Sequence, residues 1–225
     1  MLTEVDDLVA AAEALAEPGT GPLHLGVIPT VGPYVDPGLV SRLRRELPGV
    51  ELHLHEEQTD RLLAQLSDGR IDAAVLALPV DRPGLDEREL YTEPFVLAAP
   101  EGHRLVQRGS CGPEDLATEA LVLLEEGHCL RDQALDVCSL AGREGGPDIQ
   151  GTSLGTVVQM VAAGLGVTLL PASAVPVEVK GGTAVAVSEF ASPAPSRTIG
   201  IVWRSSSPRA EDIARVADLI DPPLG

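Results

Sequence analysis

Two cysteines nine residues apart, with a histidine beside the first, are the residues of this sequence best suited to chemistry. Cys129 and Cys138 lie in the segment GHCLRDQALDVC, and His128 and Arg131 flank the first of them. A histidine and an arginine next to a cysteine can stabilise its thiolate, which is the reactive form of the side chain. Most cysteines of a reduced protein are small buried side chains, so a redox role here is a hypothesis that rests on these neighbours.

The residues between the two cysteines predict a helix, and a helix would keep the thiols apart. The span LRDQALDV holds good helix formers and neither glycine nor proline. Nine residues of α-helix separate two Cα atoms by about 13 Å, whereas a disulfide requires less than about 7 Å. If both thiols are redox partners, oxidation must therefore unwind the segment, which would make it a two-state switch.

Other roles for the cysteines are less favoured by the spacing. One histidine and two cysteines nine residues apart lack the close cysteine pairs of structural zinc sites, so we expect no metal. The third cysteine, Cys111, stands beside Gly112 and Pro113 in an expected loop. We expect Cys111 to be incidental, although a nearby thiol could compete as a resolving partner.

Short apolar runs alternate with amphipathic segments from Leu23 onward, which is a βαβαβ pattern. The expected strands and helices are, in order, LHLGV from Leu23, Gly38 to Leu47, VELHLHE from Val50, Thr59 to Asp68, and AAVLAL from Ala73. Side chains and helix N-termini converge at the carboxyl ends of parallel strands. Thr30 follows the first strand and Thr59 stands at an expected N-cap, so both hydroxyls could face one cleft.

A second α/β set follows an expected strand at Phe95 to Ala99, where the chain would cross into another lobe. Its expected elements are a short helix at Pro113, strands at Leu121 to Leu124 and near Ile149, a flexible linker at Gly142 to Pro147, and a helix at Ser153 to Ala163. Thr152 or Ser153 would cap that helix and Gly164 would end it. After Ala191 a strand, TIGIVW, and a helix, Pro208 to Ile220, would return to the first lobe.

Length and charge exclude several classes of protein. With 225 residues, 44% of them hydrophobic, the chain can bury the core of one domain or of two small lobes. A net charge of −18 predicts no positively charged surface that would attract phosphates, so we do not expect this chain to bind nucleic acid by itself. It has no apolar run of roughly 18 residues for a membrane span, and its acidic start is unlike a signal peptide. We therefore expect a cytoplasmic protein.

The N-terminal segment Leu2 to Leu15 predicts a helix, which GTGP at Gly19 to Pro22 would end.

Five segments together carry a resemblance to a known family. They are GHCLRDQALDVC, IPTVGPY at Ile28 to Tyr34, LHEEQTDRLLAQL at Leu54 to Leu66, MVAAGLGVTLLPASAVP at Met160 to Pro176, and RTIGIVWR at Arg197 to Arg204. These segments resemble the regulatory domain of the LysR-type transcription regulators that sense hydrogen peroxide. The resemblance spans nearly the whole chain but includes no N-terminal winged helix-turn-helix.

The resemblance implies an α/β fold of the type 2 periplasmic-binding-protein class, in which two Rossmann-like lobes are joined by two crossing strands. Residues 1–21 would be the remnant of a linker helix. Residues 22–92 and 198–225 would form regulatory lobe I, and residues 93–197 would form regulatory lobe II with the redox cysteines.

The resemblance also implies a chemistry. Hydrogen peroxide would oxidise Cys129, the peroxidatic thiol, to a sulfenic acid, and Cys138, the resolving thiol, would condense with it to a disulfide. The expected peroxide-binding residues are Thr30, Thr59, His128, Gln133 and Arg197. No cofactor is expected. The oxidised loop would alter how subunits pair, and through that pairing how DNA is held.

The partners follow from the same resemblance. We expect a homodimer of this domain, a tetramer of the full protein, DNA contact only through a winged helix-turn-helix outside this chain, and a glutaredoxin- or thioredoxin-type reductant. No membrane partner is expected. Because the sensor would react once per cycle, we do not expect an enzyme.

Three other functions remain open. The nearest is a LysR-type domain that binds a small metabolite between its lobes, with Thr30, Thr59 and Ser153 lining an anion cleft and the cysteines incidental. A thiol peroxidase would consume peroxide continuously. A solute-binding protein would carry an export signal.

Overall fold

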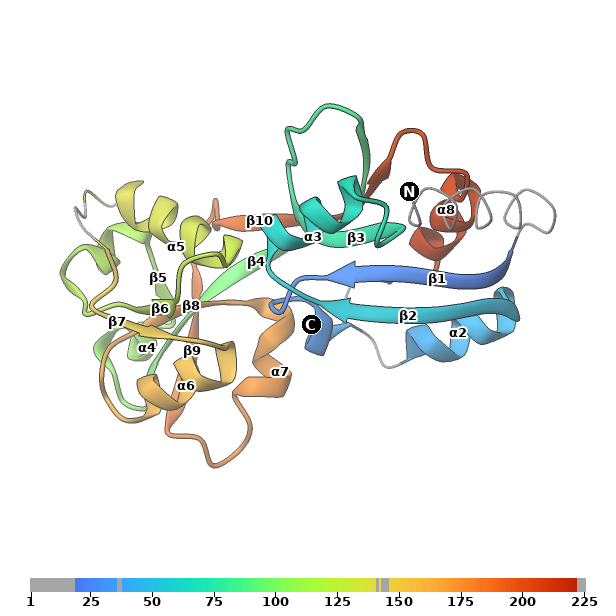
Figure 1. Cartoon of the computed structure of the whole chain (residues 1–225). Helices are drawn as coiled ribbons and strands as arrows, with labels where there is room; N and C mark the ends of the chain where they lie inside the picture. The colour runs from blue at the N-terminus through green and yellow to red at the C-terminus, as the bar shows by residue number, and fades with distance from the viewer. Residues whose placement is uncertain (1–18, 36–37, 141, 143–145, 222–225) are drawn as a thin grey trace. The chain divides into compact units, whose positions relative to one another are not determined.

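The computed structural model describes residues 19–35, 38–140, 142 and 146–221. The chain divides into two compact units, Met1–Tyr91 with Thr198–Leu224 (unit 1) and Thr92–Arg197 (unit 2). Two strands, β4 (Leu85–Pro100) and β10 (Ser196–Arg204), pass from one unit into the other, as the colours of Figure 1 allow the reader to follow.

Unit 1 is built on parallel strands with an antiparallel neighbour. β1 (Thr20–Val27) pairs in parallel with β2 (Gly49–Glu56) and with β3 (Ala73–Leu78), and β10 runs antiparallel to β3. The first four residues of β3 are buried, as expected for a central strand. β2 is the edge strand of this order.

Three helices complete unit 1 in the described part of the chain: α2 (Gly38–Glu46), α3 (Thr59–Ser67) and α8 (Ala210–Asp218), with the short 3-10 helix η1 (Gly32–Tyr34). α3 lies very close to β1. A Cβ atom at Gly26 would stand 2.5 Å from Leu62 Cδ2, so only glycine allows this approach of helix and strand. The packing fixes α3, and with it Thr59, against the end of β1.

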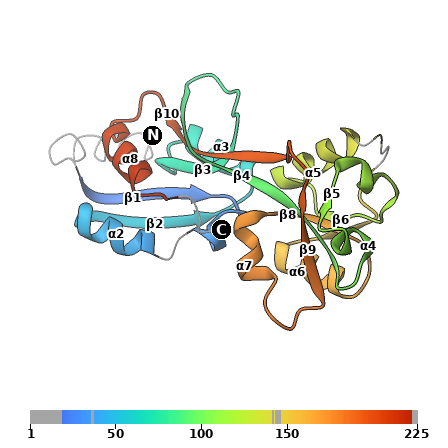
Figure 2. The same ribbon diagram turned by 180° about the vertical axis from the view of Figure 1, so that it is seen from behind.

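Unit 2 has a mixed sheet around the second half of β4. β8 (Thr168–Pro171) and β9 (Val185–Phe190) pair antiparallel with β4, and β5 (Ser110–Cys111) is parallel to β9. β6 (Val122–Leu124) and β7 (Ile149–Gly151) form a separate, parallel two-stranded sheet. Its helices, seen from behind in Figure 2, are α4 (Arg104–Gln107), η2 (Pro113–Thr118), α5 (Cys129–Leu140), α6 (Leu154–Ala162), η3 (Ala172–Ala174) and α7 (Val175–Glu178). α6 packs against β6, β7 and β8 and covers the apolar side chains of these strands.

Most of the expected strands and long helices are confirmed, with small shifts at their ends. Ser153 is the N-cap of α6, since its Oγ accepts the Thr156 N–H at 3.2 Å, and Gly164 follows the helix with a φ of 80°. The expected helix at Pro113 is instead the 3-10 helix η2. β9 and α4 were not predicted.

One expectation about the ends of the elements is wrong, and it concerns Thr59. Thr20 to Pro22 belong to β1, whose pairing with β2 begins at Thr20 and Gly49, and the helix that this segment was expected to end lies outside the described residues. Thr59 is not an N-cap but the first residue of α3, and Gln58 precedes it as the cap. The predicted helix over Leu2 to Leu15, the linker remnant to residue 18 and residues 143–145 of the predicted loop lie outside the described residues. None of the described helices is long and apolar enough to span a bilayer.

Candidate functional site

A tight turn places the first cysteine at the start of a helix. Gly127 has a φ of 93°, a left-handed conformation that favours glycine, and it carries the chain from β6 toward α5. His128 follows, and its carbonyl accepts the Arg131 N–H at 2.9 Å. Cys129 is the first helical residue and is partly exposed. Its side chain therefore stands at the positive end of a helix of 12 residues, where a negative charge is stabilised.

The second cysteine lies on the same unbroken helix, which confirms the prediction from the segment between them. At about 100° and about 1.5 Å per residue, nine residues turn Cys138 to the opposite face and move it about 13.5 Å along the axis. Both residues are thiols in the structure, and Cys138 is 1% exposed. The helix therefore keeps the two sulfur atoms out of disulfide range.

One face of α5 is packed into unit 2. Leu130, Ala134, Val137 and Cys138 are buried, and the helix lies against η2 and β6. Leu135 is only half-buried. Each buried aliphatic side chain contributes about 1.5–3 kcal/mol relative to exposure, so this face holds the helical form together.

His128 is buried, at 6% exposure, beside the first cysteine. Burial lowers the pKa of its imidazole below the ordinary value, and the nearby Glu125 carboxylate only partly opposes this. His128 is therefore neutral near pH 7 and can act as a hydrogen-bond donor or acceptor. The positive charge that the sequence suggested at this position is not available at that pH.

Three buried polar side-chain atoms near the expected site have no hydrogen-bond partner among the described residues: Thr59 Oγ1, Arg131 Nε and Gln133 Oε1. A buried polar atom without a partner is costly, and such atoms commonly mark a site for water or a ligand. Thr59 and Gln133 are two of the residues expected to bind peroxide, and Arg131 was singled out beside the first cysteine. Thr59 belongs to unit 1, and Gln133 and Arg131 to unit 2.

Thr30 and Thr59 both follow carboxyl ends of neighbouring parallel strands. Thr30 lies in the turn after β1 and is 2% exposed. β2 leads to Thr59, and the Glu57 N–H donates to the Val27 carbonyl at 3.2 Å. The two threonines thus occupy the same edge of the unit 1 sheet, where parallel α/β sheets hold their ligands.

Arg197 lies in a buried ion pair that the sequence did not predict. Its Nε and Nη2 stand 2.9 Å and 2.8 Å from Glu93 Oε1, and its side chain is 0% exposed. Glu93 Oε2 accepts the Ser173 N–H at 3.1 Å. The guanidinium therefore joins β4, β10 and η3 within unit 2. A lone glutamate ahead of an apolar run was the only signal of this partner in the sequence.

Ser153, expected in the alternative anion cleft, is exposed and caps α6. Its Oγ also lies 3.0 Å from Thr156 Oγ1. The hydroxyl is therefore engaged within its own helix turn, which weakens the metabolite-binding alternative.

Cys111→Ala is expected to leave the reaction of the protein with peroxide unchanged. Cys111 is 2% exposed, and burial, aided by the Asp115 carboxylate, raises the pKa of its thiol to about 11. A protonated buried thiol is a poor nucleophile and a poor resolving partner. The rate of thiol loss with hydrogen peroxide should agree with that of the parent within about twofold. A disulfide that includes Cys111 in peptide maps of the oxidised parent would contradict this.

Comparison with known proteins settles the family. Residues 16–222 match the model of the LysR substrate binding domain. A probable hydrogen peroxide-inducible genes activator of Mycobacterium avium is 46% identical over 96% of this chain and 69% of its own length. The DNA-binding transcriptional dual regulator OxyR of Escherichia coli K12 is 44% identical over 98% of the chain and 72% of its own length. The chain belongs to the OxyR group of the LysR family.

Solved OxyR structures have the same fold. A hydrogen peroxide-bound cysteine-to-serine mutant of Corynebacterium glutamicum OxyR matches 97% of this chain and 69% of its own, with a TM-score of 0.87 and 38% identity. A reduced form of OxyR matches with a TM-score of 0.80 and 44% identity, over 90% of this chain and 95% of its own. An oxidised form of OxyR matches with a TM-score of 0.78 and 46% identity, over 89% of this chain and 94% of its own. The predicted α/β fold of the type 2 periplasmic-binding class is confirmed.

Proposed function

We propose that this chain is the redox-sensing regulatory domain of a LysR-type transcription regulator and that hydrogen peroxide is its signal. The observation that carries the proposal is helix α5, with a partly exposed cysteine at its N-terminus and a second, buried cysteine nine residues on. Relatives of the OxyR group with reduced, oxidised and peroxide-bound structures support it.

In the first step the Cys129 thiolate attacks one oxygen of hydrogen peroxide. The O–O bond breaks, one oxygen stays on sulfur as sulfenic acid, and the other leaves as hydroxide and takes up a proton to become water. The N-terminal N–H groups of α5 favour the thiolate. Gln133 Oε1, on the same helix as Cys129, would accept a hydrogen bond from a peroxide O–H and orient it, and the Thr59 hydroxyl would donate one to the departing oxygen. Thr30 and neutral His128 are the other proposed hydrogen-bonding partners of the peroxide. Arg197, in its ion pair with Glu93, would contribute positive charge.

In the second step the Cys138 thiol attacks the sulfenic sulfur. A disulfide forms and water leaves, so the sulfur of Cys129 is protected from further oxidation. Because α5 holds the two residues about 13.5 Å apart, at least part of the helix must unwind and its buried face must leave the core. This loss of packing changes the surface of the domain, and that change is the signal.

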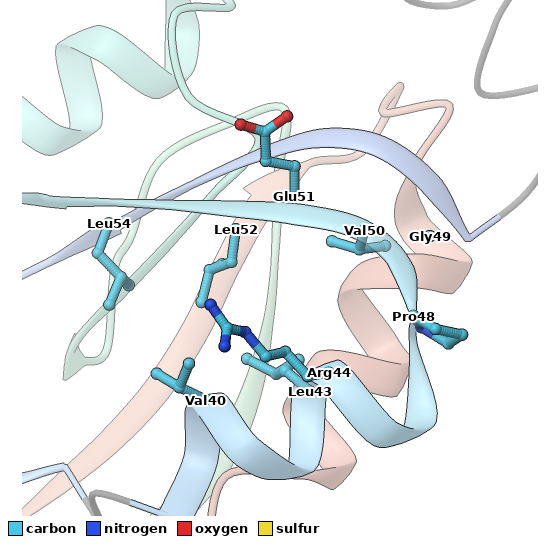
Figure 3. A pocket seen from close by; sticks show the side chains of 9 residues that line it. All are labelled: Val40, Leu43, Arg44, Pro48, Gly49, Val50, Glu51, Leu52 and Leu54. Atoms are coloured by element: carbon cyan, nitrogen blue, oxygen red, sulfur yellow. The ribbon is translucent and has the colours of Figure 1, made fainter.

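The signal passes to partners through subunit pairing. We propose a homodimer of this domain, a tetramer of the complete regulator and DNA contact through an N-terminal winged helix-turn-helix. A groove of about 620 Å³ between α2 and the edge strand β2, lined by aliphatic side chains together with Arg44 and Glu51, offers a surface for pairing. Figure 3 shows Val40 and Leu43 facing Leu52 and Leu54 across it, and Val40 and Leu54 are 43% and 54% exposed. A cytoplasmic glutaredoxin- or thioredoxin-type protein would reduce the disulfide and reset the sensor.

Intact-mass spectrometry with peptide mapping tests the proposal. After one equivalent of hydrogen peroxide, the reduced protein should contain a Cys129–Cys138 disulfide and should consume no further peroxide without a reductant. Continued consumption would indicate a thiol peroxidase. Unreacted thiols, combined with a thermal shift on adding a small anion, would indicate the metabolite-binding alternative.

Thr59→Val should slow oxidation of Cys129 about tenfold, the factor that corresponds to one hydrogen bond of about 1.4 kcal/mol. The valine keeps the shape of the side chain but removes a hydroxyl that has no partner among the described residues. Stopped-flow measurement of thiol loss gives the rate. Thr156→Val is the matched control, because that hydroxyl already lies 3.0 Å from Ser153 Oγ, and its rate should equal the parent's. Equal rates for both variants would remove Thr59 from the site.

A further inference from the structure

Three of the five histidines of the chain gather on one face of β1 and β2, apart from the residues assigned to peroxide. The parallel register sets His24 opposite His53, and His55 is two residues further along the same face. The ring of His24 stacks with both, at centroid distances of 4.8 Å to His53 and 5.4 Å to His55. β2 is the edge strand, so these rings help to hold it on the sheet.

The distance between two ring nitrogens limits the charge that the cluster can carry. His24 Nδ1 and His55 Nε2 are 3.1 Å apart, a hydrogen-bond distance. One nitrogen must donate a proton and the other must accept it. If both rings were fully protonated, two N–H groups would point at each other and two positive charges would repel. The observed geometry is compatible with no more than one charge on this pair.

The charged groups around His24 favour the neutral form as well. Two histidines of β2, His53 and His55, face the His24 ring. His53 Nε2 in turn lies 3.3 Å from Glu51 Oε1. Asp72, before β3, accepts the His24 backbone N–H at 2.7 Å, and Arg209, before α8, lies nearby. Burial lowers the pKa of His24, the two histidines and Arg209 act in the same direction, and only Asp72 opposes them.

We propose that His24, His53 and His55 form a proton-sensitive clasp that holds β2 on β1 at neutral pH and loosens it on acidification. A histidine whose pKa is lowered by folding binds protons more readily in the unfolded chain. Its contribution to stability is therefore present above the unfolded value of about 6.5 and is lost as the pH falls through the lower native value. The device is local to the edge of unit 1.

The clasp has a consequence for sensing that rests on the proposed function. β1 leads into the turn that holds Thr30, and β2 leads to Thr59 at the start of α3. Both threonines are assigned to orient the peroxide. Loosening of the two strands on acidification displaces this edge of the sheet and slows oxidation of Cys129.

Hydrogen exchange of the reduced protein tests the clasp without any peroxide. Between about pH 7.5 and about pH 5.5, after correction for intrinsic rates, protection of β1 and β2 amides should fall about fivefold relative to β9, the factor for two unit charges about 4 Å apart in water. His55→Gln keeps a hydrogen-bond partner for His24 but removes one titrating ring, so β1 and β2 protection in this variant should depend on pH less than in the parent. His24→Gln removes the buried ring itself, so the pH dependence should fall further, and the double variant should respond to pH no more than His24→Gln does.

The outcomes separate this inference from the proposed function. The same pH response in the parent and in both single variants would overturn the clasp. An inert Cys129 would refute the peroxide function and leave the exchange result untouched. A clasp that loosens while the parent and His55→Gln oxidise with the same pH profile would refute only the link to sensing.

Discussion

Cys129→Ser is expected to abolish the reaction with hydrogen peroxide, with a fall in rate of more than about a thousandfold, as loss of a nucleophile produces in enzymes. A serine hydroxyl is not ionised near neutral pH, so the helix N-terminus and the surrounding donors have no nucleophile to act on. Thiol loss followed by stopped flow, with mass spectrometry of the product, measures the effect. Cys138 should stay reduced in this variant, because at 1% exposure it is shielded from peroxide.

Cys138→Ser is the matched control for the first variant. It keeps the nucleophile and should react at close to the parent rate, but the product should stop at the sulfenic acid on Cys129. No disulfide can form, so α5 should retain its helical signal after oxidation. Oxidation of Cys138 in the Cys129→Ser variant at the parent rate would reverse the assignment of the two thiols.

The order of elements could be predicted because each depends on local sequence. The helix between the cysteines, the alternation from Leu23 onward and the cap at Ser153 all reflect spacing within a few residues. β9 was missed because its pattern is not a clean alternation. Val187 is 37% exposed while Ser188 is buried, so the apolar residue faces outward and the polar one inward.

The site could be predicted only where one segment contains it. Cys129, Cys138, His128 and Gln133 lie within a single turn and helix, and the threonines follow strand ends. The Glu93 and Arg197 pair joins residues 104 positions apart, and no local pattern could pair them. The neutral state of His128 follows from burial, which depends on the whole fold.

Glu93→Ala is expected to destabilise the protein by about 3–5 kcal/mol, since removing one member of a buried ion pair leaves the other charge uncompensated. Arg197 would remain fully buried without its carboxylate, and the Ser173 N–H would lose its acceptor. Equilibrium unfolding in urea measures the change. Asp60→Ala is the matched control, because the Asp60–Arg82 pair is exposed at 3.3 Å and should contribute less than about 1 kcal/mol.

A double replacement separates the stability of this pair from its chemistry. Glu93→Leu with Arg197→Met removes both charges at similar volume, and apolar substitutes for a buried pair commonly recover most of the lost stability. If Arg197 contributes charge to the peroxide reaction, this variant should fold like the parent and still oxidise Cys129 more slowly. If it folds and oxidises at the parent rate, Arg197 is a structural residue that fastens β4, β10 and η3 together, and the peroxide site consists of the remaining residues.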